Sequence, residues 1–598
     1  MPHFSVPQLL SVGDLYPKAG RYSPPPAQVE LLHVVEGVVA LPAFLAFQLK
    51  QIRLPFVARR VRLYCHCVLL ILKHLITFID SVCVGAIDGA PKCADPSWSL
   101  WQGFQGNDFC CQAGFVGIYQ SSGNVAGTCV VSDQVGTATT ARLMSRGTGS
   151  TATTLASTTT IAKTSTSSTT MKSTSTSTVR STSTKAVFAH YMVGSMTEAE
   201  AVTDVQDAMN AGFDGFALNT HTISSSDTWN TDALNYLFTA AAETNFKLFI
   251  SFDMSWGLDV TQLAAFLAPY AKKDAYYMVN GQAFISTYTG GTISNSAWSS
   301  GFIEPLKSTY GITPFFVPDF DDFSGYPTGV FSAYPVLNGV FSWESAWPSP
   351  GTTPTNVSDG VDSAALQEAH RAGKAYMMPV SPFQFKYLGS GQDWYRIGEV
   401  NLPERMGQVL QLQPDFVEVI TWNDAGESHY VGDFWKEQIA GSTIGDYSNG
   451  FDHKGWLQII TPFIQAYKTG ATTISQISPP STKPVGTIWY RTLLTSASCS
   501  SSISNHQSAL DTVNFAVILP STGYKIKVYS NSNLIGTFAG QKGLNYNSVP
   551  GLTAGSGQKI EVLDSSNKVV ASATGTKSVL AESSNSICNW NYEVVGLS

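Results

Sequence analysis

Charged residues are scarce in this sequence. Asp, Glu, Lys and Arg make up 13% of the 598 residues, against about 25% in ordinary soluble proteins. The surface must therefore be polar through Ser, Thr, Asn and Gln, while aromatic residues reach 12%. This style is common in secreted proteins that handle carbohydrate. A net charge of -8 without a basic stripe argues against a nucleic-acid partner.

Several motifs of catalysis and metal binding are also missing. The sequence has no GxSxG turn, no P-loop and no HExxH helix. It has no CxxC or HxxxH spacing, which a zinc site would need. We expect neither a cofactor nor a metal ion.

Cysteine is absent from the long middle of the chain, between Cys129 and Cys499. The nine cysteines include one cluster near the N-terminus and a pair that brackets a C-terminal segment. This placement predicts disulfide-stabilised modules around a self-sufficient core, with zinc as the less supported alternative. The cysteines expected to form disulfides are Cys93, Cys110, Cys111, Cys129, Cys499 and Cys588.

Residues 1–86 are expected to be a signal or anchor region, or a misread gene start. Three arginines precede an apolar run that ends at Val84, Gly85 and Ala86, the small-x-small pattern of a signal-peptidase site. About sixty residues stand before this run, which favours the misread start over an internal signal-anchor. The mature, secreted protein would begin near Ile87.

A Ser/Thr-rich tract over residues 134–184 cannot bury apolar area and is expected to be an O-glycosylated linker. It separates a small cysteine-rich module, residues 87–133, from the rest of the chain. Trp98, Trp101 and Phe104 in this module suit stacking on a polysaccharide or formation of its own small core. Asn356 lies in an N-glycosylation sequon.

From Lys185 onward, eight apolar strand candidates alternate with helical patterns. They begin near residues 185, 215, 246, 276, 313, 338, 374 and 416. Their number and order predict a (β/α)8 TIM-type barrel over residues 185–484. A doubly wound open sheet is the alternative, but "HYMVGSM" after the first strand is not a phosphate-binding turn.

Residues 485–598 show alternating apolar and polar residues with Asn and Gly turns, as in "YKIKVYSNSNLIGTFAG". This pattern predicts an antiparallel β-sandwich, closed by a bridge between Cys499 and Cys588.

The carboxyl ends of the predicted strands carry acids, indoles, imidazoles and amides, which suit glycoside hydrolysis. Asp424 and Glu427 in "TWNDAGESHYVG" are the candidate catalytic carboxylates. The candidate substrate-binding residues are His190, Tyr191, Asn219, His221, Asp253, Trp256, Tyr288, Asp319, Asp321, Trp343, Glu344, Trp347, Trp422, Asn423, His429 and Tyr430.

Each candidate also has a structural interpretation. Trp343 and Trp347 would equally cap the barrel core, and Asp253 or Asp319 would serve as a helix N-cap. His190 would be a satisfied core histidine. The repetition of sugar-suited groups at several independent strand ends favours the functional interpretation.

The segments "VFAHYMVG", "FISFDMSW", "FFVPDFDD", "GVFSWESAWP", "TWNDAGESHYVG" and "HKGWL" resemble the fungal α-1,3-glucanases, or mutanases, of glycoside hydrolase family 71. The resemblance implies a secreted endo-acting enzyme that cleaves α-1,3-glucan with inversion, using carboxylates that map onto Asp424 and Glu427. We expect a monomer, without membrane attachment in the mature form. A wall-binding or adhesive protein built on an inactive barrel is the alternative function.

For inversion, the two carboxyl groups are expected about 6.5 to 9.5 Å apart, against roughly 5 Å in a retaining pair. Glu427 is assigned as the acid and Asp424 as the base.

Overall fold

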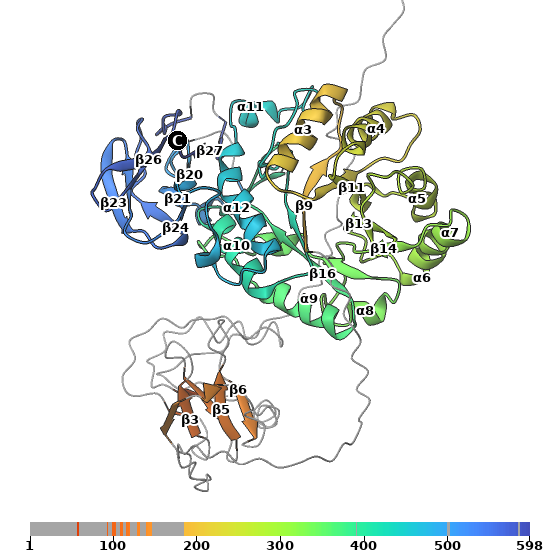
Figure 1. The fold of residues 1–598 in the computed structure, drawn as a ribbon, viewed down its shortest axis with the longest axis horizontal. Coiled ribbons are helices and arrows are strands. Elements are labelled where there is room, and N and C mark those ends of the chain that lie inside the picture. The colour runs from red at the N-terminus through yellow and green to blue at the C-terminus, as the bar shows by residue number, and fades with distance from the viewer. Residues whose placement is uncertain are drawn as a thin grey trace, which may run out of the picture. The chain divides into compact units, whose positions relative to one another are not determined.

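The computed structural model describes residues 185–389, 391–498, 503–583 and 587–598, together with eight short strands nearer the N-terminus (Figure 1). The chain forms two compact units, Met1–Thr174 and Ser175–Ser598. Among the described residues, no helix has the length and apolar character needed to cross a membrane.

The strands of the first unit pair in an antiparallel manner. Leu100, Trp101 and Cys111 are buried, and Cys111 is disulfide-bonded. The side chains of Cys93, Cys110 and Cys129 lie outside the described part of the chain. The strands are β1 (Val57–Ala58) with β2 (Lys92–Cys93); β3 (Ser99–Gln102) between β4 (Asp108–Cys111) and β8 (Arg142–Ser145); and β5 (Phe115–Tyr119) between β6 (Thr128–Val131) and β7 (Thr139–Thr140). Because β7 and β8 lie past residue 133, paired strands continue into the range predicted as linker.

The second unit is built on a curled parallel sheet. Side by side, its strands run in the order β13, β11, β10, β9, β19, β16, β15, with β14 paired to the free side of β13. All of these pairings are parallel. The bounds are β9 (Ala186–Met192), β10 (Gly215–Thr220), β11 (Lys247–Asp253), β13 (Gln282–Tyr288), β14 (Pro314–Phe316), β15 (Gly339–Phe341), β16 (Ala375–Val380) and β19 (Phe416–Val419).

The two end strands of this order, β14 and β15, also approach each other. The backbone N–H of Asn338 donates to the carbonyl of Phe316 at 2.8 Å, and that of Phe341 donates to Pro318 at 2.9 Å. Asp319 and Phe341 form an isolated parallel bridge.

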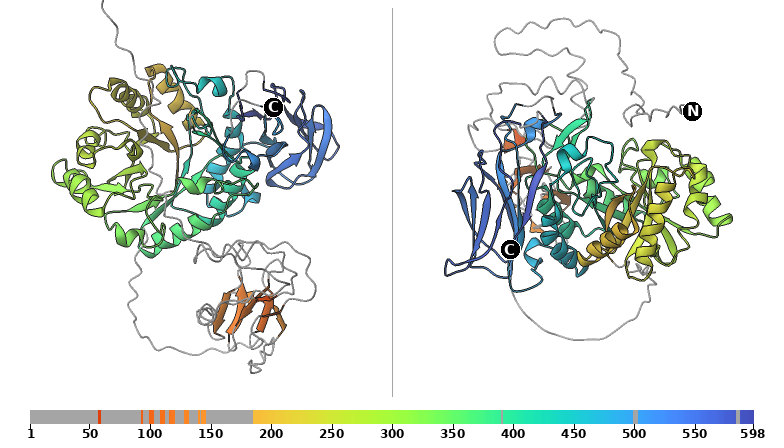
Figure 2. Two further views of the ribbon diagram at one scale, coloured as in Figure 1. Left: turned by 180° about the vertical axis from the view of Figure 1, so that it is seen from behind. Right: turned by 90° about the horizontal axis from the view of Figure 1, so that it is seen from above.

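Helices alternate with these strands and lie outside the curled sheet (Figures 1 and 2). Local sequence defines their starts: Thr197 and Glu200 form a capping box at α3, and Asp259 caps α5. The longer helices are α3 (Glu198–Asn210), α4 (Thr228–Ala242), α5 (Val260–Leu267), α9 (Gly360–Arg371), α10 (Asn401–Leu412) and α12 (Leu457–Lys468). The shorter ones are α6 (Asn295–Trp298), α7 (Glu304–Ser308), α8 (Val330–Ala333) and α11 (Gly445–Ser448).

All eight strands expected from the sequence are present. The apolar run at residue 276 differs, since it divides into β12 (Met278–Val279) and β13, which pair in an antiparallel manner. The turn between them is Asn280–Gly281, both with positive φ, a conformation that Asn and Gly adopt more readily than other residues.

An aromatic layer fills the inside of the curled sheet. The ring of Phe188 on β9 lies 4.9 Å from Phe249, 5.8 Å from Phe284 and 6.2 Å from Phe416. Because side chains along a strand alternate between faces, His190 also points inward, one layer closer to the carboxyl end of β9.

The C-terminal part contains two four-stranded antiparallel sheets, ordered β24-β21-β20-β27 and β23-β22-β25-β26. Ile488 and Phe515 from the first sheet share a buried apolar cluster with Ile526 and Ile560 from the second. Cys588 is disulfide-bonded, and Cys499 lies outside the described residues. The strands are β20 (Val485–Arg491), β21 (Thr512–Leu519), β22 (Lys525–Ser530), β23 (Asn533–Ala539), β24 (Gly543–Pro550), β25 (Lys559–Leu563), β26 (Val569–Thr574) and β27 (Tyr592–Gly596).

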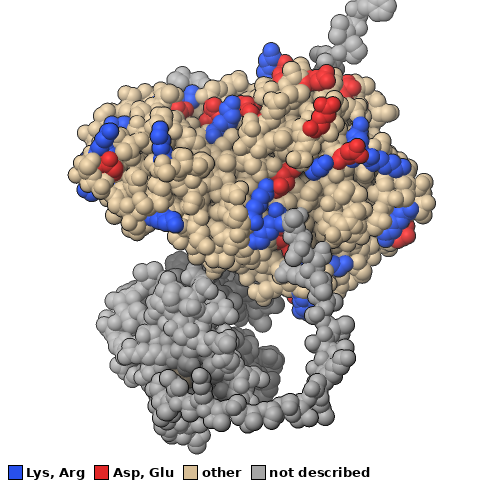
Figure 3. Space-filling model, viewed as in Figure 1, with Lys and Arg blue, Asp and Glu red and all other residues tan. Residues whose placement is uncertain are grey.

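These sheets pack against the α/β part through buried groups. The hydroxyl groups of Tyr395 and Tyr592 are 2.7 Å apart, and the indole N–H of Trp489 donates to Gly398 at 3.4 Å. Charged residues are sparse and scattered on the face seen in Figure 3, as the composition predicts.

Candidate active site

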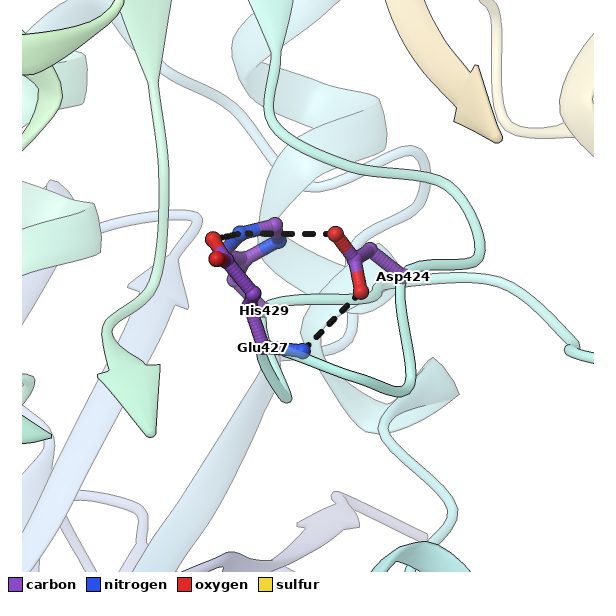
Figure 4. Close-up of side chains that lie close together, drawn as sticks. All are labelled: Asp424, Glu427 and His429. Atoms are coloured by element: carbon purple, nitrogen blue, oxygen red, sulfur yellow. Dashed lines mark hydrogen bonds and ion pairs between the residues drawn. The ribbon is translucent and has the colours of Figure 1, made fainter. Parts of the chain in front are cut away.

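Asp424, Glu427 and His429 lie together on the loop that follows β19 (Figure 4). The backbone N–H of Glu427 donates to Asp424 Oδ1 at 2.9 Å, and that of Asp424 donates to Thr421 Oγ1 at 2.9 Å. Ser428 has a φ of 63°, an uncommon conformation for a non-glycine residue. Such backbone strain, found between two site residues, is typical of functional loops.

Hydrogen-bond donors surround the Glu427 carboxylate. Gln384 Nε2 donates to Oε2 at 2.5 Å, His429 Nε2 lies 3.1 Å from the same oxygen, and Lys386 Nζ lies 3.4 Å from Oε1. Burial alone would raise the pKa of Glu427, but His429, Lys386 and Gln384 outweigh it and lower this pKa to about 2. Glu427 is therefore held as a carboxylate anion.

The pKa of Asp424 is shifted in the opposite direction, upward. Its side chain is 15% exposed, and its Oδ2 lies 4.0 Å from His429 Nε2. Burial raises the pKa of Asp424, and the neighbouring Glu427 charge adds to this, while His429 opposes it. Two carboxyl groups whose pKa values are pushed apart by their surroundings are typical of an acid and its anionic partner.

The two carboxyl groups are closer than the sequence-based expectation for inversion. One oxygen of Asp424, one of Glu427 and one ring nitrogen of His429 all lie within 4.8 Å of one another. This spacing is nearer to the roughly 5 Å of a retaining pair than to 6.5 Å or more. Among the described residues, these three side chains also form the one group arranged so that it could hold a metal ion.

Aromatic side chains form a wall beside the cluster. The His429 ring lies 5.6 Å from Trp347 and 6.1 Å from Trp343. Trp343 also contacts Tyr288 at 5.1 Å and His190 at 4.8 Å. Burial, and then the charges of Glu427, Asp319, Glu344 and Asp253, raise the pKa of Tyr288. These predicted site residues thus pack against one another, and Trp343 and Trp347 are only 6% and 3% exposed.

The acids from other strands mainly hold backbone groups. Asp253 accepts hydrogen bonds from the N–H and hydroxyl of Ser255 at 3.1 and 2.5 Å. Asp319 Oδ1 accepts from the Trp343 N–H at 3.2 Å, and Asp321 Oδ2 accepts from that of Glu344 at 2.9 Å. Burial raises the pKa values of Asp253 and Asp319, and that of Asp321 to about 6. These contacts are those of a helix cap at Asp253 and of loop anchors at Asp319 and Asp321, and substrate binding by these acids stays a prediction.

Glu344 forms an ion pair with the hairpin of β17 (Gln384–Tyr387) and β18 (Asp393–Arg396). Its Oε2 lies 2.7 Å from the Arg396 guanidinium.

A separate aromatic row lies at the end of β10, where the His221 ring is 4.8 Å from Trp256 and 5.3 Å from Trp229. Trp256 is 48% exposed, as a sugar-stacking residue would be. Asn219 is buried on the same strand.

Four predicted substrate-binding residues point elsewhere. Tyr191 and Trp422 both donate to the buried carboxylate of Asp204 on helix α3, at 2.7 and 2.9 Å. Tyr191 follows the inward-facing His190, so strand alternation turns it toward the helices. The other two are Asn423, whose amide bonds both backbone groups of Met192 at 2.8 and 3.0 Å, and Tyr430, whose hydroxyl donates to Phe451 at 2.5 Å.

Sequence reasoning missed Lys386, Thr421 and Glu418. Lys386 belongs to the hairpin of β17 and β18, which lies between β16 and α10. Its alternation in "QFKY" places Gln384 and Lys386 on one face, and this signal could have identified the pair.

The family model described as glycosyl hydrolase family 71 matches residues 183–598. Among curated proteins, the chain is similar to a glucan endo-1,3-alpha-glucosidase of Schizosaccharomyces pombe, at 33% identity over 61% of this chain and 85% of that protein. It is similar to the ascus wall endo-1,3-alpha-glucanase of the same organism, at 28% identity over 68% of this chain and 96% of that protein. A mutanase of Penicillium rubens is 32% identical over 48% of this chain and 62% of that protein.

Among solved structures, a GH99 endo-alpha-mannosidase from Bacteroides thetaiotaomicron aligns with a TM-score of 0.39 and 11% identity. The alignment covers 48% of this chain and 98% of that chain.

Proposed function

The chain belongs to glycosyl hydrolase family 71, and on that premise we propose that it is an endo-acting hydrolase of α-1,3-glucan whose catalytic groups are Asp424 and Glu427. The observation that carries the proposal is the electrostatic split between these carboxyl groups. Glu427 is held ionised with a pKa of about 2, whereas burial raises that of Asp424. The names of the relatives supply the substrate.

The same split supports Asp424 as the acid and Glu427 as the base, the reverse of the roles assigned from the sequence. Asp424 in its protonated form donates its proton to the leaving glycosidic oxygen. Glu427, anchored by Gln384, Lys386 and His429, directs a water molecule to the anomeric carbon. Trp343 and Trp347, which are buried and contact the His429 ring, reduce access of bulk water to the pair from that side.

The inverting course rests on the family resemblance, because a pKa of about 2 weakens Glu427 as a nucleophile and as a general base alike. The distance between the nearest carboxyl oxygens of Asp424 and Glu427, within 4.8 Å, favours retention instead. Inversion therefore requires the pair to separate when sugar and water enter, and the configuration of the first product tests this.

The architecture that we propose is a closed (β/α)8 barrel over residues 185–484, followed by a β-sandwich over residues 485–598. The sequential strand order and the hydrogen bonds between the β14 and β15 segments support closure over a doubly wound sheet. The apolar cluster shared by the two antiparallel sheets supports the sandwich. The cysteine-rich module, the Cys499–Cys588 bridge and the linker stay predictions.

We further propose that the protein is secreted, acts on wall polysaccharide as a monomer and carries an N-glycan at Asn356. Asn356 is exposed, and its amide donates to Glu404 at 2.6 Å. The resemblance to an ascus wall glucanase supports a wall substrate.

The test is release of reducing sugar from insoluble α-1,3-glucan. The wild-type protein should release it, and the Asp424→Asn variant should bind the glucan without release. Binding by the wild type without release under any mildly acidic condition would instead support a wall-binding protein with an inactive barrel.

A further inference from the structure

Two buried ionisable side chains inside the curled sheet take no part in the mechanism above. His190 on β9 and Glu418 on β19 are each 1% exposed, and Glu418 Oε1 lies 2.6 Å from His190 Nδ1. The strands that carry them are neighbours in the sheet. A carboxylate bound to one ring nitrogen fixes the proton on that nitrogen and sets the orientation of the ring.

The other ring nitrogen is left open. His190 Nε2 and Glu418 Oε2 are buried and have no hydrogen-bond partner among the described residues. Buried polar atoms in native proteins nearly always have a partner, so an unpartnered nitrogen of this kind indicates a ligand or an ordered water.

The position of the ring connects it to the candidate active site. His190 lies one layer above the aromatic plug of Phe188, toward the carboxyl ends of the strands. Its ring contacts Trp343 edge to face at 4.8 Å, and Trp343 in turn contacts Tyr288 and His429. His429 bonds Glu427. A chain of contacts through Trp343 and His429 therefore connects His190 to the candidate catalytic Glu427.

We propose that His190 Nε2 binds a hydroxyl group of the sugar at the cleavage point, and that Glu418 is a positioning residue that acts through His190. The inference rests on the proposed glucan hydrolysis and deepens it. In the tautomer with Nδ1–H donating to Glu418 and no proton on Nε2, His190 presents Nε2 as an acceptor, which suits a sugar hydroxyl donor. A carbohydrate hydroxyl can donate or accept a hydrogen bond. One fixed acceptor therefore helps to orient the sugar ring, and it need not be charged.

The experiment is a double-mutant cycle of Glu418→Gln and His190→Asn, with kcat and KM measured on soluble α-1,3-gluco-oligosaccharides. Glu418→Gln removes the carboxylate charge and allows the new side-chain amide N–H to donate to His190 Nδ1. This would favour the tautomer with the proton on Nε2, in which Nε2 is no longer an acceptor. We expect kcat/KM to fall about 10- to 100-fold, the usual cost of losing an orienting partner. In the His190→Asn background, the same substitution should change kcat/KM by less than about 2-fold, because coupled residues do not act additively.

Ser286→Ala is the matched control. Ser286 is also buried inside the sheet, and its hydroxyl donates to the Val317 carbonyl at 2.8 Å. Its replacement should leave kcat/KM within about 2-fold of wild type, whatever it does to thermal stability. A merely structural role of Glu418 would lower stability and leave the kcat/KM of the folded protein unchanged.

Additive losses in the two single variants, or wild-type kcat/KM in Glu418→Gln, would overturn the proposal and leave an ordered water as the partner of Nε2. Rates are referred to the folded fraction measured by circular dichroism, and Glu418→Asp, which keeps the charge, replaces Glu418→Gln if that variant does not fold. Failure of the wild-type protein to hydrolyse α-1,3-glucan would instead contradict the proposed function.

Discussion

The backbone N–H of Glu427 donates a hydrogen bond to Oδ1 of Asp424 at 2.9 Å, so one candidate catalytic carboxyl group fixes the backbone that carries the other. This contact is of the capping type that the three-residue spacing suggests. The structural and the catalytic interpretation of the pair are thus compatible. Asp424 Oδ1 holds the turn, which leaves Oδ2 for the proposed proton transfer.

Replacing either carboxylate should abolish most activity. We expect Asp424→Asn and Glu427→Gln each to lower kcat by about 10²- to 10⁴-fold, the usual contribution of an acid or base. Both variants should bind insoluble glucan, because the amide oxygen that Asp424→Asn introduces still accepts from the backbone of the loop. Asp433→Asn is the control, since Asp433 follows the pair on the same loop and forms an ion pair with Lys454 at 2.9 Å. Wild-type turnover in either catalytic variant would place the site elsewhere.

The pH profile should depend on Lys386. In the proposed mechanism Glu427 is ionised and Asp424 protonated, so activity should fall as pH drops toward the Glu427 pKa of about 2 and as pH rises through the raised pKa of Asp424. Lys386→Met removes a cation that favours the Glu427 anion, which raises this pKa. We therefore expect the acid limb of kcat/KM to move upward by up to about one unit.

Two variants check the sign of this shift. Lys386→Arg keeps the cation and should keep the acid limb near its wild-type position. Lys454→Met removes a lysine that pairs with Asp433 and should leave the limb in place. A downward shift in Lys386→Met would contradict the assignment of Glu427 as the anion.

Sequence patterns predicted the fold better than they predicted side-chain directions. Apolar, β-branched runs identified all eight parallel strands, because a strand buried on both faces must be apolar throughout. Because such a strand shows no alternation of apolar and polar residues, its sequence does not indicate which side chains face the inside of the sheet. Tyr191 and Trp422 were assigned to substrate, whereas both reach Asp204 on α3, a partner that no local pattern reveals.

The roles of the two carboxylates could not be derived from the loop alone. Their pKa values depend on Gln384 and Lys386, which come from a hairpin about forty residues earlier in the chain. A sequence gives the spacing of Asp424 and Glu427 but not the donors that a tertiary fold brings to one of them. The proposed assignment of Glu427 as the base rests on those donors.

Asp204 should make the protein less stable as pH rises toward neutrality. Burial raises its pKa to about 7 from an ordinary 3.8, although Trp422, Trp435 and Tyr191 donate hydrogen bonds that lower it. A group whose pKa is higher in the folded state stabilises fully below its unfolded pKa, and this contribution is lost as pH rises through the folded pKa. The loss between about pH 4 and pH 7 is up to about 4 kcal/mol.

Urea unfolding at about pH 4 and about pH 7 measures this effect. The wild type should lose stability over that range relative to Asp204→Asn, which has no proton to release. Asp207→Asn on the same helix is the control and should keep the wild-type dependence. Equal pH dependence in wild type and Asp204→Asn would show that Asp204 is ionised throughout.

A fragment that starts at Lys185 should fold and hydrolyse glucan on its own. The compact second unit contains the whole curled sheet, the candidate site and the C-terminal sheets. We expect the fragment to match the full chain on soluble or swollen glucan and to lose mainly its hold on insoluble material. Equal activity of both proteins on insoluble glucan would remove a binding role from the N-terminal module, and an unfolded fragment would refute the boundary.

The configuration of the first product tests the mechanism most directly. Inversion needs a water molecule between Glu427 and the anomeric carbon, with Asp424 on the opposite face of the sugar. The closest oxygens of the pair now lie within 4.8 Å, so the loop must open by roughly 2 Å to reach the range of inverting pairs.

We therefore expect proton NMR of the earliest products of α-1,3-glucan hydrolysis to show the β-anomer, before mutarotation mixes the signals. The same spectra with Glu427→Gln should show no product, since no group then activates water. An α-anomer formed first would mean that the short spacing is the working geometry and that Glu427 attacks the anomeric carbon itself. In that case Asp424 would serve first as acid and then as base, and the raised pKa of Asp424 would have to fall after the first step for it to accept a proton from water.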